Sequence, residues 1–225
     1  MRNSKFLIFI YLLLSKCFYS QDPDVFTSTT NGIWNDNTVT TPWSYNGTDS
    51  DGIPDKDDEV IINHDITSSP NAYDKIDKIT LNTGSSITLN PNYYLMIYGQ
   101  YQTSIIDGNI NGPGLLIFAL SHTFSGSGLL SNFDLQINSW YCYFDVDIIA
   151  NSVNVPTTGG FEVSSGRTLT INGSFIKSRS NNLINNLGTF IINNSNFMTT
   201  GKPPEEEFYS TNGNIIYNAN GELPT

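Results

Sequence analysis

Short apolar segments recur along the chain, and polar turn residues separate them. Within most segments the apolar side chains occupy positions i and i+2, which is the period of a β-strand with one buried face. The segments are Ile79–Leu81, Ile87–Leu89, Leu95–Ile97, Leu115–Ile117, Leu135–Ile137, Val153–Val155, Leu169–Ile171, Phe190–Ile192 and Ile215–Tyr217. No stretch has the period of an amphipathic helix. The pattern predicts an all-β chain.

The spacing of these segments indicates how the strands are arranged. Gly- and Asn-rich turns punctuate them, for example at 82–84, 165–166 and 172–173, and residues 83–90 nearly repeat in residues 164–172. Strands this short and this frequent are typical of stacked coils, in which each coil gives one strand to each sheet. We therefore predict a right-handed parallel β-helix (a solenoid) with an N-terminal cap. A β-sandwich is the alternative, although many turns are too close together for its paired antiparallel strands.

The first twenty residues have the pattern of a secretory signal peptide. Arg2 and Lys5 precede the apolar run 6–14, and Ser20 precedes a plausible cleavage point at Gln21. The run is too short to cross a bilayer as a helix, so no transmembrane segment is predicted. A lipid anchor on Cys17 is the alternative, but the lysine before it fits that processing site poorly. We expect export to the cell surface or beyond, a polar leader or edge strand over 21–31 and a β-helix domain over 32–225.

The net charge and the cysteine count limit which binding partners and disulfide bonds are expected. The formal charge is −11, and residues 1–20 contain bases but no acids, so the remainder is still more acidic. Such a surface repels nucleic acid and anionic membranes. Cys142 is the only cysteine beyond residue 20, so that part of the chain forms no internal disulfide. We expect Cys142 to be a small buried apolar residue.

An acidic loop over 49–58 is the strongest local signal. Its carboxylates are Asp49, Asp51, Asp55, Asp57 and Asp58, with Gly52 and Pro54 to bend the backbone. A hard dication ligated by oxygen atoms relieves the repulsion between such charges. The run Asp-x-Asp-Gly-Ile-Pro-Asp-x-x-Asp resembles the thrombospondin type 3 repeat, and the resemblance implies bound Ca2+. A solvated acidic turn is the alternative. A second loop over 202–207, rich in Pro and Glu, is predicted to protrude into solvent.

A wider resemblance covers residues 32 to about 100. The pattern is Trp34, Trp43, Ile53-Pro54, the strand Asp57–Ile62, His64 and Ile79–Leu81. It resembles the opening of the eight-glycine (G-eight) domain and of related secreted bacterial β-helix proteins. The resemblance implies a right-handed β-helix at the cell surface, sometimes associated with glycan binding. The ending 221–224 resembles the junction before the sorting domain of type-nine secretion cargo.

Two groups of aromatic residues form a candidate ligand-binding surface. In residues 140–148 the even positions (Trp140, Cys142, Phe144, Val146 and Ile148) are predicted to face the core, which turns Tyr141, Tyr143, Asp145 and Asp147 outward. Around residue 95 the same reasoning turns Tyr94, Met96 and Tyr98 outward. Flat rings beside carboxylates suit sugars, because a ring packs on apolar sugar faces while the carboxylate accepts hydroxyl hydrogen bonds. Ordinary surface tyrosines on strands are the alternative.

No catalytic constellation is recognisable in the sequence. His64 and His122 are the only histidines, too few to indicate a catalytic zinc site, and His64 is expected to be half-buried and paired with backbone. Glycoside hydrolysis needs two carboxylates across a cleft, whereas Asp145 and Asp147 are neighbours on one strand. We predict an adhesin-like protein that binds polysaccharide or surface glycan. A polysaccharide-degrading enzyme (a lyase or glycoside hydrolase) and a purely structural segment are the alternatives. The sequence predicts no oligomeric state.

Overall fold

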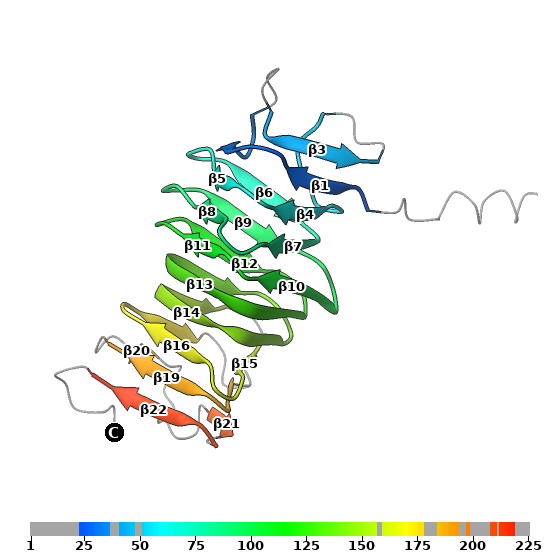
Figure 1. Ribbon diagram of the computed structural model, residues 1–225. Helices are drawn as coiled ribbons and strands as arrows, with labels where there is room; N and C mark the ends of the chain where they lie inside the picture. The colour runs from blue at the N-terminus through cyan, green and yellow to red at the C-terminus, as the bar shows by residue number, and fades with distance from the viewer. Residues whose placement is uncertain are drawn as a thin grey trace, which may run out of the picture.

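The computed structural model describes residues 23–36, 41–47, 51–156, 159–177, 184–193, 197–198, 208–210 and 212–218. Within these residues the chain forms 22 strands, and all of them belong to one continuous hydrogen-bonded system. The described part of the chain contains no helix of the length and apolarity needed to cross a bilayer. Turns stack from β1 and β3 at the N-terminal end to β22 at the other end (Figure 1). The predicted parallel β-solenoid is confirmed.

Each turn contributes strands to three faces, and strands of one face pair in parallel with the turns above and below. Face A contains β1 (Val25–Ser28), β4 (Glu59–Ile62), β7 (Lys78–Leu81), β10 (Gln102–Ile106), β15 (Phe161–Val163), β18 (Ile184–Asn186) and β21 (Phe208–Ser210). Face B contains β2 (Gly32–Ile33), β5 (Asp65–Thr67), β8 (Ser86–Thr88), β11 (Asn109–Asn111), β16 (Thr168–Ile171), β19 (Thr189–Ile192) and β22 (Asn214–Tyr217). Face C contains β6 (Tyr73–Ile76), β9 (Tyr94–Ile97), β12 (Leu115–Phe118), β17 (Phe175–Lys177) and β20 (Phe197–Met198).

Two central strands run through all three faces. β13 (His122–Ile137) and β14 (Cys142–Val155) pair with each other along most of their length, and they pair with strands of faces A, B and C in turn. Glycine lets β13 turn the corner between faces A and B. A Cβ atom on Gly126 would lie 2.1 Å from the Ile106 carbonyl oxygen, and one on Gly128 would lie 1.8 Å from the Gly108 carbonyl oxygen. The corner therefore accepts no side chain at either position.

The core is a set of inward-facing columns that run along the solenoid axis. Strand after strand alternates buried and partly exposed residues, as the sequence pattern predicts. Phenylalanines from successive turns meet in the middle: the ring of Phe144 lies 5.6 Å from that of Phe118 and 5.5 Å from that of Phe161, measured between centroids. Each turn therefore buries its apolar side chains against its neighbours rather than within itself.

The N-terminal end is closed by an aromatic cap. β1 pairs in parallel with β4 and antiparallel with β3 (Trp43–Asn46), so the segment predicted as a leader contains a strand of the cap. Trp34 and Trp43 pack edge to face with ring centroids 5.2 Å apart, and Trp43 Nε1 donates a hydrogen bond to the Trp34 carbonyl oxygen at 2.8 Å. Phe26 and Trp34 are fully buried. The predicted cap is confirmed.

Asparagine side chains link successive turns at the corners. The amide hydrogen bonds join Asn82 to Asn63, Asn92 to Asn71, Asn193 to Asn172 and Asn218 to Asn193, with N–O distances of 2.6 to 3.2 Å. Asn71 and Asn92 also adopt positive φ angles of 58° and 59°. Asparagine tolerates this left-handed conformation better than most residues, so it serves both the backbone bend and the stacking.

Replacing a column phenylalanine tests this account of the core. We expect Phe144→Ala to lower the free energy of unfolding by about 3–5 kcal/mol, because the cavity falls between Phe118 and Phe161. The matched control is Tyr143→Ala on the same strand, whose side chain points outward and is 44% exposed. It should cost less than about 1 kcal/mol. Chemical denaturation measures both values, and equal losses would contradict the assignment of faces.

Candidate functional site

Among the side chains that the structure describes, the two most exposed aromatic ones lie on the same corner of the solenoid. Tyr101 and Trp140 are each 82% exposed, and both lie in connections from face C to face A. The Tyr101 amide donates to the Ser121 carbonyl oxygen at 2.7 Å, and His122 pairs with Cys142 in the next turn. Tyr101 and Tyr141 therefore lie in one column, two turns or about 10 Å apart. We call Tyr101, Trp140 and Tyr141 the aromatic corner.

Next to the aromatic corner, face A presents a tyrosine and several polar side chains. The rings of Tyr141 and Tyr143 meet edge to face, with centroids 5.1 Å apart. Tyr143 pairs in register with Glu162, which pairs with Asn185, so these three side chains form one outward row. Asn185 Nδ2 donates to Glu162 Oε2 at 2.6 Å. The Tyr141 hydroxyl hydrogen-bonds with both side chains, and burial together with the charge of Glu162 raises the pKa of Tyr141 to about 12.

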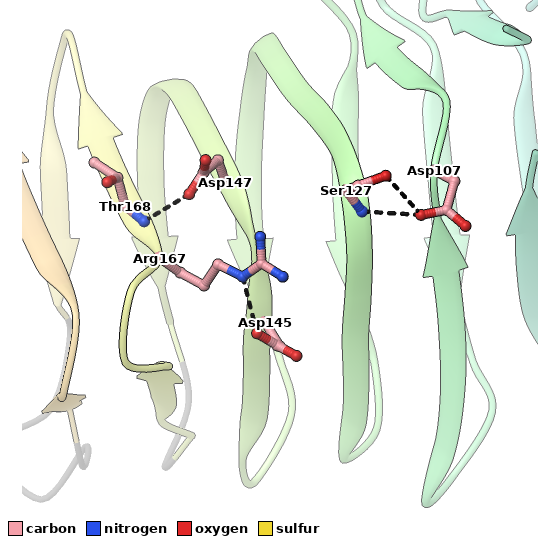
Figure 2. A network of polar contacts seen from close by, with 6 residues as sticks. All are labelled: Asp107, Ser127, Asp145, Asp147, Arg167 and Thr168. Atoms are coloured by element: carbon pink, nitrogen blue, oxygen red, sulfur yellow. Dashed lines mark hydrogen bonds and ion pairs between the residues drawn. The ribbon is translucent and has the colours of Figure 1, made fainter. Parts of the chain in front are cut away.

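The two predicted carboxylates on β14 are both engaged with the following turn. Asp145 Oδ1 accepts from Arg167 Nε at 2.9 Å, and Asp147 Oδ1 accepts from the Thr168 amide at 2.8 Å. Figure 2 shows these contacts on neighbouring strands, with a similar contact of Asp107 to Ser127 farther along the axis. These carboxylates hold adjacent turns together, and Asp145 also lies on the same face as Tyr143.

The structure brings together only part of the predicted ligand surface. Tyr141, Tyr143 and Asp145 share a neighbourhood, and Asp147 lies at the next corner. Tyr98 lies in the connection between β9 and β10, with Lys56 Nζ 4.9 Å from its ring centroid. Tyr94 instead lies on face C, 41% exposed, with its ring 6.5 Å from that of Tyr73. The predicted tyrosines thus belong to two surfaces.

One prediction for this region is wrong. Trp140 was expected to face the core together with Cys142, Phe144, Val146 and Ile148. The last four are buried, but Trp140 is 82% exposed. The reason is that β14 begins at Cys142, so strand alternation does not extend back to Trp140. Cys142 is a buried apolar residue as predicted, and burial raises the pKa of its thiol to about 11.

Several residues of this surface were missed by sequence reasoning. They are Tyr101, Glu162, Arg167 and Asn185, which come from other turns than Tyr141 and Tyr143. The number of residues per turn is the sequence feature that would have revealed them. Once residue 122 is aligned with 142, and 143 with 162, these residues fall beside the tyrosines.

Two described carboxylates of the acidic loop accept hydrogen bonds from backbone amides of the same loop. Asp51 Oδ1 accepts from the Ile53 amide at 2.9 Å, and Asp58 Oδ2 accepts from the Asp55 amide at 2.6 Å. Asp58 is only 5% exposed, whereas Asp57 reaches outward to Lys56 at 3.6 Å. These hydrogen bonds fix the backbone directly before β4 begins at Glu59.

The predicted calcium site stays a prediction. Asp49 and the Pro/Glu loop lie outside the described residues. In the described part of the chain, no group of three or more His, Cys, Asp or Glu side chains is arranged to hold a metal ion. The carboxylates of Asp51 and Asp58 also accept backbone hydrogen bonds.

Both histidines contact backbone carbonyl groups. His64 is half-buried with its Nδ1 2.9 Å from the Ser28 carbonyl oxygen, as predicted. His122 is buried, with Nδ1 2.9 Å from the Gly99 carbonyl oxygen and Nε2 2.8 Å from Ser104 Oγ. A proton on Nδ1 satisfies the carbonyl, and Nε2 then accepts from the serine. The Ser104–His122 pair looks like a nucleophile and base, but both side chains are at most 1% exposed, so substrate has no access.

A buried carboxylate lies near the cap. Asp74 is 9% exposed and faces inward from β6, where Tyr93 donates to it at 2.6 Å and Asn35 at 3.2 Å. Burial raises the pKa of Asp74, and burial together with the aspartate raises that of Tyr93 well above its usual value. The three side chains come from the cap and two successive turns, so they fasten the cap to the solenoid. Sequence reasoning gave no sign of this contact.

No protein-family model, curated protein or solved structure matches this chain. The resemblances to the eight-glycine domain, the thrombospondin type 3 repeat and type-nine secretion cargo therefore stay predictions. Function is therefore inferred from the geometry of the aromatic corner and of the adjoining part of face A.

The buried His122 makes stability depend on pH. Burial lowers the pKa of His122 below its ordinary 6.5, and Lys78 lowers it further, against the opposing effect of the Gly99 carbonyl. Below about pH 6.5 the unfolded chain therefore binds more protons than the folded one. The free energy of unfolding should fall as pH drops through this window, by up to about 1.4 kcal/mol per pH unit.

Denaturation at about pH 7 and pH 5.5 tests this dependence. His122→Asn should remove the histidine contribution to the slope while lowering stability at both values. Phe144→Ala is the control, since it removes a buried side chain that does not titrate, and it should lower stability but retain the slope. An unchanged slope in His122→Asn would show that other groups cause the dependence.

The acidic loop supplies a second test. Asp58→Ala removes the acceptor of the Asp55 amide and should lower the free energy of unfolding by about 1–3 kcal/mol. Asp57→Ala, at a side chain that is 84% exposed, should change it by less than about 0.5 kcal/mol. If the two variants unfold alike, Asp58 does not organise the loop.

Proposed function

We propose that this protein is a secreted or cell-surface, adhesin-like β-helix that binds polysaccharide along the aromatic corner and the adjoining part of face A. The observation that carries the proposal is the shared corner of Tyr101 and Trp140, each 82% exposed. Exposing a large aromatic ring to water is unfavourable in free energy, and clusters of exposed rings are typical of binding surfaces. The secretory pattern of residues 1–20 supports an extracellular ligand.

The chemistry of the surface fits a carbohydrate. Aromatic rings pack on the apolar faces of sugars, and Tyr141, Tyr143 and Trp140 supply such rings at adjacent positions. Glu162, Asn185 and Arg167 lie on the same side and offer acceptors and donors for hydroxyl groups. The columns run along the solenoid axis, so an extended chain of sugars matches them better than a single small molecule.

The proposal predicts ring-dependent binding to glycans. On a glycan array the protein should bind at least one class of polysaccharide, and Trp140→Ala and Tyr143→Ala should each weaken that binding about tenfold. Tyr94→Ala is the matched control, because it removes a similarly exposed ring from face C. Its affinity should equal that of the unaltered protein.

The other outcomes separate the alternatives. If no glycan binds, the purely structural alternative gains support and the proposal fails. If shortened oligosaccharides appear after incubation, the protein is an enzyme rather than a binding module. Loss of binding in Tyr94→Ala, with Trp140→Ala unaffected, would move the site to face C.

A further inference from the structure

The charges beside the aromatic corner are unbalanced. Asp145 and Glu162 contribute two carboxylates, and Arg167 is the basic side chain that contacts one of them. The Arg167 guanidinium is bound to Asp145 at 2.9 Å, which matches its charge locally. The whole chain is acidic as well, with a formal charge of −11. An anionic polysaccharide would be repelled from this surface.

Glu162 is a carboxylate that is in hydrogen-bond contact with the Tyr141 side chain. It lies between Tyr143 and Asn185 in the register of face A, and the Tyr141 hydroxyl also reaches it. Its hydrogen bonds to Asn185 and Tyr141 come from neutral donors, so they orient the carboxylate without cancelling its charge. Glu162 therefore presents a fixed negative charge beside two tyrosine rings.

Such an arrangement favours a cation over a neutral hydroxyl group. A protonated amine gains from the negative faces of aromatic rings and from the carboxylate at the same time. Glu162 is half-buried, so solvent screens its charge less than that of a fully exposed side chain.

We propose that the ligand is a polysaccharide of amino sugars whose amines are protonated, with Glu162 as the residue that selects the charge. This inference rests on the proposed function, since it names the class of glycan that the aromatic corner binds. The rings hold the sugar faces, and Glu162 distinguishes a free amine from a hydroxyl or an acetylated amine. Asn185 and Tyr141 position the carboxylate.

Calorimetric titration of the full chain with matched oligosaccharides tests the inference. The probes are β-1,4-linked oligomers of equal length that carry glucose, N-acetylglucosamine or glucosamine, at about pH 6, where glutamate is ionised. The glucosamine oligomer should bind about tenfold more tightly than the other two. Glu162→Gln should remove that preference, so that the affinities for the three oligomers then agree within about twofold. Asp65→Asn on face B is the matched charge control and should keep the preference.

The outcomes distinguish this inference from the proposed function. If all three oligomers bind equally and Tyr143→Ala weakens them all, glycan binding stands and selection by charge is wrong. If no oligomer binds, the amino-sugar inference is wrong, and the glycan array decides whether the proposed function stands. If polylysine binds as tightly as the glucosamine oligomer, with no loss in Trp140→Ala, the surface attracts any polycation and the amino-sugar inference is overturned.

Discussion

The fold depends on the parallel backbone ladder between successive turns. Along each face, a residue pairs with the residue one turn earlier and one turn later, and the side chains therefore stack in columns. The sequence separation of hydrogen-bonded residues in adjacent turns varies from 18 for Ser104 and His122 to 28 for Asn186 and Asn214, and it reaches 36 for Ser28 and His64 at the cap. The ladder tolerates this variation because the additional residues enter the corners, where no strand pairing is lost.

This constraint divides the polar residues into two kinds. Inside the solenoid, each polar group needs a partner in a neighbouring turn, as Asp74 has in Tyr93 and His122 has in Ser104. Those contacts stabilise the stack and are closed to solvent. On the outside, a corner can lengthen or present a large side chain without disturbing the columns beneath it. The surfaces available for binding are therefore the corners and the outward rows, where Tyr101, Trp140 and Tyr143 lie.

The pairing of successive turns also explains which features can be predicted from the sequence and which cannot. Alternating apolar residues predict the strands and their buried faces, because alternation is a local property: Leu95, Ile97, Phe144 and Ile148 are all buried. Register between turns is not local. It requires the length of each turn, which the irregular repeat conceals, and so the pairing of Tyr143 with Glu162 was not predicted. Trp140 was misplaced for a related reason, since its position depends on where β14 begins.

Register also decides which carboxylates are bound by the neighbouring turn. Asp147 binds the backbone of the following turn and Asp145 binds Arg167, so both contribute to the stack itself. Glu162 differs because its hydrogen-bond partners Asn185 and Tyr141 are neutral side chains. A rigid ladder fixes its distance from the tyrosine rings before any ligand arrives, and such pre-organisation lowers the entropy lost on binding. Charge and ring are thus placed together by the stacking of turns, which is the same interaction that builds the fold.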